Sequence, residues 1–251
     1  MQYNMRNNMG VDLYLAAGVL SSPHFLEQFR VKLHRAMVSH VDIGEIHSQL
    51  VFPYGDWSVP LKTQLSEVSR DLHIHEGRYA RSIGGTRLLA MIDQSRELRE
   101  LATLTILIGH SAGGIASLHA AKLLLEREGK HNCFVVMIGS PKCRIPEGLS
   151  DNVFYLFAEG GHTVNGRKRT LRLADPITRL GTFGGWHSGR MRFPLWNNKL
   201  HAPLHKRGLP IIGGHADYFR NESPYLNELG ISNLTLTIDT MMLWLSQRIK
   251  L

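Results

Sequence analysis

The stretch 101–129, LATLTILIGHSAGGIASLHAAKLLLEREG, decides the fold of this chain. Apolar residues dominate 104–108, which predicts a strand buried on both faces, as strands of parallel sheets are. From 114 to 128 apolar residues recur at helical spacing, and Gly129 is typical of the position where a helix ends. A buried strand joined by a tight turn to a helix is the repeating unit of parallel α/β architectures, so we expect one here.

The turn between strand and helix reads Gly109-His110-Ser111-Ala112-Gly113, a G-x-S-x-G pattern. A serine on so sharp a turn has a strained backbone that raises its hydroxyl above the sheet edge, and the glycines leave room for neighbouring backbone. The helix that follows directs its free N–H groups at the serine, so the N–H of Ala112 is expected to stabilise an oxyanion. A glycine turn with an incidental serine is the alternative, and the flanking strand and helix favour the nucleophile.

This strand, turn and helix resemble the nucleophile elbow of the α/β-hydrolase superfamily, and within it that of lipases and esterases. The resemblance implies a three-layer α/β fold, with a mostly parallel central sheet between helices on both faces. Family members usually carry two antiparallel strands before the strand that we predict at 11–17, and the chain has no room for them, so we expect a shortened sheet. Without repeats or linkers, 1–251 is predicted to be a single domain.

The resemblance also implies a second oxyanion donor in the turn after the first strand. In the family this donor is the backbone N–H that follows a His-Gly pair or its equivalent. Aligning Ala17-Gly18 with that pair puts the donor at Val19, with Leu20 as the alternative, because one sequence does not fix the register. A helix is expected to follow directly, at 21–39.

A serine hydroxyl is a poor nucleophile, so Ser111 needs a base, and the base needs a carboxylate to orient it. The chain has fourteen histidines. His215 fits the base best, because it follows an apolar, strand-like run at 209–212 and two glycines, shortly before the last predicted helix. Its His-x-x-Tyr-Phe sequence resembles that of lipase-like members, while an ordinary structural histidine is the alternative. His110 is expected to point away from the site.

The family places the acid between serine and histidine in the chain. Asp175, in the sequence Leu-Ala-Asp-Pro-Ile, resembles the Asp-Pro-Val segment that carries the acid in the lipases called class 3, where a Gly-Ser-Pro turn like that at 139–141 also precedes it. Glu159, directly after a predicted strand at 152–157, is the alternative acid. An aspartate before proline is also a common structural turn residue.

The resemblance therefore implies a serine hydrolase that cleaves carboxylic esters, a lipase or carboxylesterase, through a Ser111-Asp175-His215 triad and an acyl-enzyme. An acyltransferase or thioesterase with the same triad is one alternative, and a non-catalytic binding module of the same fold is another. The run 182–204, rich in Gly, Trp, Arg and His, predicts a small lid or loop over the site. The expected partner is a small ester or lipid.

Composition narrows the class of protein further. Hydrophobic residues make up 43% and charged residues 20% of the chain, which is typical of a globular protein. The net charge of +8 is compatible with weak association with anionic lipid surfaces, but a charge excess spread over a solvated surface is the favoured alternative. No dense basic block with aromatic residues points to nucleic acid. Cys133 and Cys143 are expected to be free thiols. No third ligand accompanies the pair His73 and His75, so neither a metal nor another cofactor is expected.

Two features bear on the compartment. No apolar run is long enough to span a membrane, and Asp12 interrupts the apolar residues near the start, which do not make a convincing signal peptide. We therefore expect a cytoplasmic protein, with a secreted mature form as the alternative.

Overall fold

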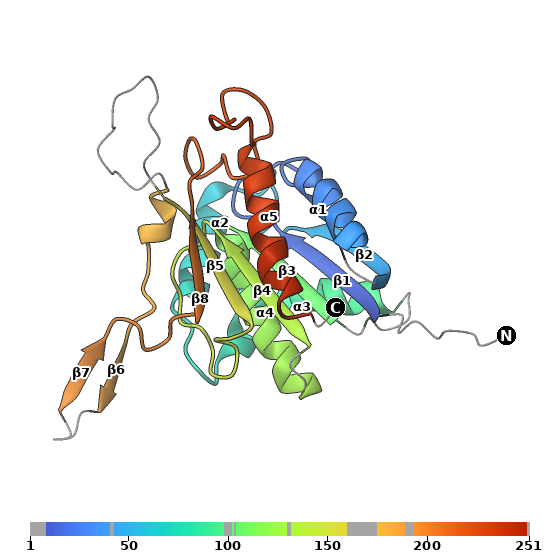
Figure 1. Cartoon of the computed structure of the whole chain (residues 1–251). Coiled ribbons are helices and arrows are strands. Elements are labelled where there is room, and N and C mark those ends of the chain that lie inside the picture. The colour runs from blue at the N-terminus through green and yellow to red at the C-terminus, as the bar shows by residue number, and fades with distance from the viewer. Residues whose placement is uncertain are drawn as a thin grey trace, which may run out of the picture.

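The computed structural model describes residues 9–40, 43–97, 102, 104–129, 132–159, 175–188 and 193–249. A six-stranded sheet with the order β2-β1-β3-β4-β5-β8 forms its centre, and every adjacent pair runs parallel (Figure 1). The strands are β1 (Met9–Ala16), β2 (Ile43–Val51), β3 (Leu104–His110), β4 (Cys133–Ile138), β5 (Val153–Ala158) and β8 (His205–Leu209). This is the general α/β layout that the sequence predicts.

Helices cover both faces of the sheet, as Figure 1 shows. They are α1 (Glu27–His40), α2 (Leu61–Leu72), α3 (Ile83–Arg96), α4 (Ala112–Glu128) and α5 (Asn233–Ser246), with single 3-10 turns η1 (Tyr79–Arg81) and η2 (Ile177–Arg179). Side chains of a strand alternate between the faces, so β1 contributes to two cores. Leu13 and Leu15 pack with α1 and α5, whereas Tyr14 and Ala16 pack with α3 and α4.

Two predicted boundaries need correction, and one helix was not predicted. The first helix begins at Glu27 rather than near Ser21, because the carbonyl of Ser21 accepts the N–H of Trp57 and the segment up to α1 is a series of turns. The segment 61–72, to which no element was assigned from the sequence, forms α2. The last strand, β8, precedes the apolar run predicted at 209–212 and has polar, exposed side chains, because it is an edge strand that pairs only with β5.

The two cysteines lie where the sequence indicates. Cys133 and Cys143 are free and buried, which confirms that prediction. Burial raises the pKa of each thiol to about 12, so neither is a reactive thiolate near neutral pH. In the described ranges, no helix is long and apolar enough to cross a membrane.

Part of the run predicted as a lid forms an antiparallel hairpin of β6 (Gly185–Ser188) and β7 (Pro194–Asn197). The chain leaves the body at Phe183 and returns at His201, whose N–H donates to the carbonyl of Phe183 over 2.8 Å. Leu204 N–H then donates to the carbonyl of Ser150 (2.9 Å), just before β5, and β8 begins beside β5. The base of the hairpin therefore lies at the amino end of β5.

Ser111 follows the carboxyl end of β3, at the opposite edge of the parallel sheet. Figure 1 shows the hairpin extending away from the body. Trp186 and Trp196 pair across it with ring centroids 5.4 Å apart and are 64% and 46% exposed. The excursion predicted at 182–204 is present, but its described part is a hairpin and does not cover the serine.

Candidate functional site

The backbone of Ser111 is strained in the way that its position on the turn predicts. Its φ and ψ are 55° and −129°, between the last residue of β3 and the first of α4. Positive φ is unfavourable for a residue with a side chain and costs on the order of 1–3 kcal/mol. Within the described part of the chain, Leu20 is the other non-glycine residue with positive φ. Both strained residues thus belong to the segments that were predicted to form the site.

The glycines of the motif allow three backbone segments to meet. A Cβ on Gly109 would collide with the backbone of Gly113, and a Cβ on Gly113 would collide with the carbonyl of Ala16 in β1. A Cβ on Gly18 would lie 2.6 Å from Cβ and 3.1 Å from Oγ of Ser111. The turn after β1 therefore packs directly against the serine side chain.

Asp175 and His215 are brought together although forty residues separate them. Nδ1 of His215 lies 2.9 Å from Oδ2 and 3.0 Å from Oδ1 of Asp175, whose side chain is fully buried. A carboxylate only accepts hydrogen bonds, so Nδ1 carries the proton and Nε2 is left as the basic nitrogen. The His215 side chain is 26% exposed, so the imidazole is open to solvent whereas the Asp175 carboxylate is not.

Further donors hold the Asp175 carboxylate in place. Tyr218 donates its hydroxyl proton to Oδ2 over 2.8 Å, and the N–H of Ile177 donates to Oδ1 over 2.9 Å. The Tyr218 oxygen also accepts the N–H of Ala158 (2.8 Å), which ties the acid to the end of β5. In the sequence, Tyr218 is marked only by the His-x-x-Tyr-Phe pattern, which does not predict this role.

The pKa of Asp175 reflects two opposing effects. Burial raises it, but the hydrogen bond and charge of His215 lower it, as do the hydrogen bonds from Tyr218 and the N–H of Ile177. The net result is a pKa below the usual value, so Asp175 is an anion at neutral pH. Burial, with the charge of Asp175, raises the pKa of Tyr218 far above its usual range, which keeps the phenol protonated as a donor.

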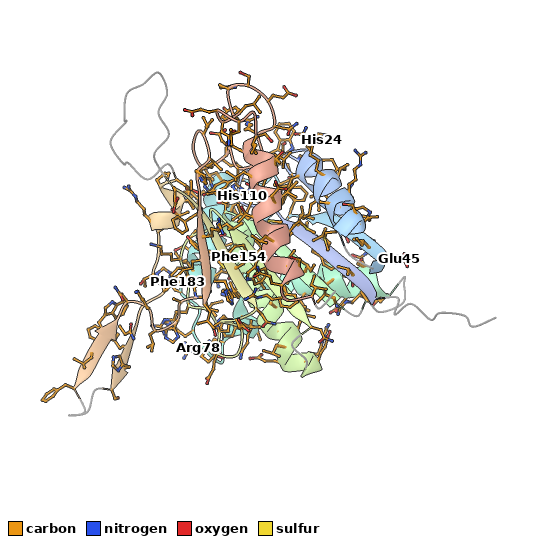
Figure 2. All side chains as sticks on the ribbon, viewed as in Figure 1. His24, Glu45, Arg78, His110, Phe154 and Phe183 are labelled. Carbon is orange, nitrogen blue, oxygen red and sulfur yellow. The ribbon has the colours of Figure 1, made fainter. Side chains whose placement is uncertain are left out.

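His110 does not point away from the site as the sequence analysis expects. Its ring stacks on that of His215 with centroids 4.7 Å apart, and its Nε2–H donates to the backbone carbonyl of His215 over 3.0 Å. Burial, and then the charge of His215, lower the pKa of His110 to about 3, so it is neutral. Strand parity could have shown this, because Ile106 and Ile108 face the core shared with α1 and α5. Figure 2 labels His110 near α5.

The structure does not join the serine to its predicted base. No hydrogen bond links Ser111 Oγ to His215, although both residues are described. Ser111 is 8% exposed, and its chain neighbour His110 contacts the His215 ring. Hydrogen bonds of this kind are often long without substrate and shorten when one binds. The serine and the Asp175-His215 pair therefore lie at one edge of the sheet as neighbours rather than as a connected triad.

The alternative acid lies elsewhere. Glu159 donates its N–H to the carbonyl of Leu209 over 2.8 Å, and its exposed side chain packs beside Gly208 on β8. Its carboxylate makes no hydrogen bond to His215 among the described residues. Asp175 is thus the carboxylate that contacts the imidazole.

Two of the three oxyanion candidates have free N–H groups. The N–H of Leu20 donates to Oε1 of Gln64 over 3.0 Å, so it is occupied. Gln64 is itself buried and fixed by bonds from Nε2 to the carbonyls of Asp56 and Val59. In the described ranges, no hydrogen bond engages the N–H of Val19 or that of Ala112, so both can donate to a bound oxygen.

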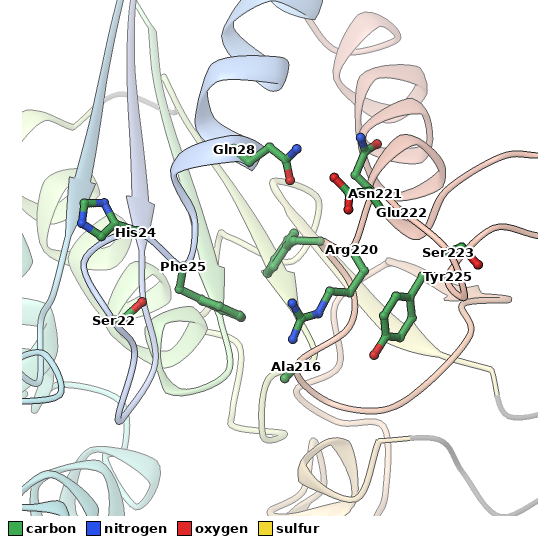
Figure 3. A pocket seen from close by; sticks show the side chains of 11 residues that line it. Ser22, His24, Phe25, Gln28, Ala216, Arg220, Asn221, Glu222, Ser223 and Tyr225 are labelled. Atoms are coloured by element: carbon green, nitrogen blue, oxygen red, sulfur yellow. The ribbon is translucent and has the colours of Figure 1, made fainter.

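A cavity of about 510 Å³ opens beside His215, between the β1–α1 connection and the loop that follows the histidine (Figure 3). Its lining comprises Ser22, His24, Phe25, Gln28, Ala216, Phe219, Arg220, Asn221, Glu222, Ser223 and Tyr225. Ala216 follows His215 directly, so the cavity adjoins the base. The described residues contain no cluster of three or more His, Cys, Asp or Glu side chains that could hold a metal ion.

No protein-family model matches the chain, and no curated protein matches it either.

Proposed function

We propose that this protein is a serine hydrolase of carboxylic esters, with Ser111 as nucleophile, His215 as base and Asp175 as the acid that orients the base. The hydrogen bond between His215 Nδ1 and the buried Asp175 carboxylate carries the proposal. It fixes the tautomer in which Nε2 can accept a proton, beside a serine held at positive φ.

The reaction follows from these positions. Ser111 Oγ attacks the ester carbonyl and gives its proton to His215 Nε2, while Asp175 stabilises the imidazolium. The N–H groups of Val19 and Ala112 stabilise the tetrahedral oxyanion. His215 then protonates the departing alcohol, and water, activated by the same histidine, releases the acid from Ser111.

The fold supports a place in the α/β-hydrolase superfamily, which we include in the proposal. The nucleophile follows a strand within a parallel sheet, and acid and histidine follow later strands, in the chain order Ser, Asp, His.

A fluorophosphonate probe tests the proposal directly, because it modifies only an activated serine. We expect labelling at Ser111, located by peptide mass spectrometry, and turnover of p-nitrophenyl esters that the label abolishes. An assay with an added alcohol separates hydrolysis from acyl transfer, since a transferase forms a new ester. Absence of labelling and turnover in the folded protein would favour a non-catalytic binding module.

A further inference from the structure

The two sides of Ser111 differ in polarity. On the side of α2, Leu20, Trp57, Leu61 and Leu65 are between 41% and 68% exposed. Two hydrogen bonds bring them together: Leu20 N–H to Gln64 in α2, and Trp57 N–H to the carbonyl of Ser21. An apolar surface therefore borders the turn that carries the Val19 oxyanion donor.

The cavity on the side of His215 is lined very differently. Phe25, Ala216 and Phe219 are its apolar residues, and the other lining residues are polar or charged. Phe25 and Phe219 contact each other, with ring centroids 5.8 Å apart, and both contact His110. The cavity thus combines an aromatic wall near the histidines with polar groups around it.

Arg220 is the side chain of this lining that is best placed to bind an anion. Its Nε donates to Oδ1 of Asp217 over 3.3 Å, and its guanidinium lies 5.7 Å from the ring of Tyr225. In the described part of the chain, its two terminal nitrogens make no hydrogen bond. Figure 3 shows the guanidinium reaching toward Ala216 with Tyr225 beside it. The remaining N–H donors match the two oxygens of a carboxylate.

The charged side chains in and beside the lining favour a ligand with one negative charge over a ligand with two. Glu222 is the acidic residue of the cavity, and Asp217 already pairs with Arg220. These two carboxylates would repel a doubly charged phosphate more than a carboxylate. His24 is the remaining ionisable side chain apart from the Tyr225 phenol.

The chemistry of a triad decides which part of a substrate enters the cavity. The histidine protonates the leaving oxygen, so the leaving group must lie on the side of His215. This step rests on the proposed function. The acyl group then lies on the other side, along the apolar surface of Leu20, Trp57, Leu61 and Leu65.

We propose that the substrate is an ester with an apolar acyl group and an alcohol that carries a carboxylate, which Arg220 binds in the cavity beside His215. The bond between Ser111 Oγ and the acyl carbon forms as the bond from that carbon to the alcohol oxygen breaks. The serine proton passes through His215 Nε2 to the alcohol. Water then hydrolyses the acyl-enzyme, and no oxidant or reductant is needed.

Two butyrate esters test this proposal: 4-(butyryloxy)benzoate and its methyl ester, in which the carboxylate is masked. The wild type, Arg220→Gln and Arg207→Gln are compared by the ratio of kcat/KM for the two esters, so that the intrinsic reactivity of each ester cancels. Arg207 is an exposed arginine on β8, outside the cavity lining, and it controls for the loss of one surface charge.

We expect Arg220→Gln to lower the preference for the carboxylate ester about three- to fivefold, because the Arg220 side chain is 55% exposed and ion pairs at exposed sites are weak. Arg207→Gln should leave it unchanged, and Glu222→Gln should raise it. Equal effects of Arg220→Gln and Arg207→Gln, or no effect of either, would overturn the proposal while leaving a Ser111-dependent esterase in place.

Binding of 4-hydroxybenzoate, the product alcohol, separates this proposal from the proposed function. Calorimetry on Ser111→Ala with and without Arg220→Gln needs no turnover. Binding that requires Arg220 in a protein that hydrolyses neither ester would support the anion site and refute the esterase. Absence of both binding and hydrolysis would refute both.

Discussion

The protein contains two buried polar networks built from the same four residue types. The first comprises Asp175, His215 and Tyr218, beside Ser111. The second lies between α2, α3 and α4 and comprises Asp71, Tyr54, Ser82 and His119. Each has a buried aspartate that accepts a hydrogen bond from a tyrosine hydroxyl, and each has a histidine and a neighbouring serine. The same residue types therefore do not by themselves make a catalytic site.

The order of the contacts separates the two networks. In the second network, Ser82 donates to Asp71 (2.9 Å) and accepts from the N–H of Gly85 (2.9 Å) and from His119 Nδ1 (2.9 Å). Its hydroxyl thus lies between acid and histidine and is fully used. In the first, the histidine contacts the acid, and the serine hydroxyl has no such partner.

The two networks also differ in the backbone conformation of their serines and in the solvent exposure of their side chains. Ser82 has an ordinary φ of −67° and caps α3, whose N–H groups at Ile83 and Gly84 donate to Asp71. A carboxylate at a helix amino end stabilises that end. Ser82, Asp71 and His119 are each 1% exposed, whereas the His215 side chain is 26% exposed. The second network therefore stabilises the fold, and only the first can meet a substrate.

Replacing Ser111 and Ser82 should show the difference between the two networks most clearly. Ser111→Ala is expected to abolish fluorophosphonate labelling and to lower kcat by several orders of magnitude without loss of stability. Ser82→Ala should keep labelling but lower the free energy of unfolding by about 1–3 kcal/mol, because Asp71, Gly85 and His119 each lose a partner. Denaturant unfolding and labelling of both variants check this. Undiminished labelling of Ser111→Ala would refute its role as nucleophile.

Replacing the two aspartates should likewise affect turnover in one network and stability in the other. Asp175→Asn favours the wrong tautomer of His215 and should lower kcat by about four orders of magnitude. Asp71→Asn should leave kcat near that of the wild type and lower the free energy of unfolding by about 3 kcal/mol, because an amide cannot accept all four hydrogen bonds. Glu159→Gln is the matched control and should be mild in both assays. If Glu159→Gln were the slower enzyme, the acid would have to be reassigned.

The two networks should also differ in how they make the free energy of unfolding depend on pH. Burial lowers the pKa of His119 to about 4, so it stays neutral when folded and takes up a proton on unfolding below its ordinary pKa of 6.5. Its contribution to stability is therefore lost as pH falls from 6.5 towards 4, by about 2 kcal/mol at pH 5. His119→Gln should flatten the decrease in unfolding free energy measured between pH 7 and 5.

Asp175 affects the stability of the fold in a different pH range from His119. Its pKa is lowered below 3.8 in the folded protein, so its contribution is complete above that value and is lost only as pH falls through the folded pKa. Asp175→Asn should therefore leave the decrease in stability between pH 7 and 5 unchanged. A flattened decrease in this variant would mean that Asp175 titrates in that range.

The smallest effects are expected from the two tyrosines. Tyr218→Phe removes one of the donors to Asp175 but leaves those of His215 and Ile177, so kcat/KM should fall about tenfold or less. Tyr54→Phe should leave kcat/KM unchanged and lower the free energy of unfolding by about 1 kcal/mol. Equal kinetics of the two variants would show that Tyr218 only supports the fold.

The parts of the molecule that the sequence predicts well have local signals. The strand at β3, the turn and the helix at α4 lie in one segment, and Ser232, a residue type typical of helix starts, caps α5 by accepting from Thr235 N–H over 3.1 Å. The helix α2 was not predicted although it also has a local signal, because Leu61, Leu65, Val68 and Leu72 recur at helical spacing.

No sequence pattern predicts the second polar network. Its members lie between 11 and 37 residues apart along each of its hydrogen bonds, so no motif joins them. The stacking of His110 on His215 also joins residues 105 apart in sequence, and only strand parity hints at it. Asp175 and His215 were predicted as partners because their sequence motifs resemble lipase segments, whereas their spacing alone does not pair them.

Gln64 has a consequence for how such a site can change. This buried side chain holds Leu20, Asp56 and Val59 through backbone atoms alone, so the shape of the turn after β1 does not depend on which side chains Leu20 and Trp57 carry. We therefore expect that those side chains can be exchanged, within the limits set by the positive φ of Leu20, while the proposed oxyanion donors stay in place. Selectivity for the acyl group can thus evolve, or be engineered, separately from the chemistry.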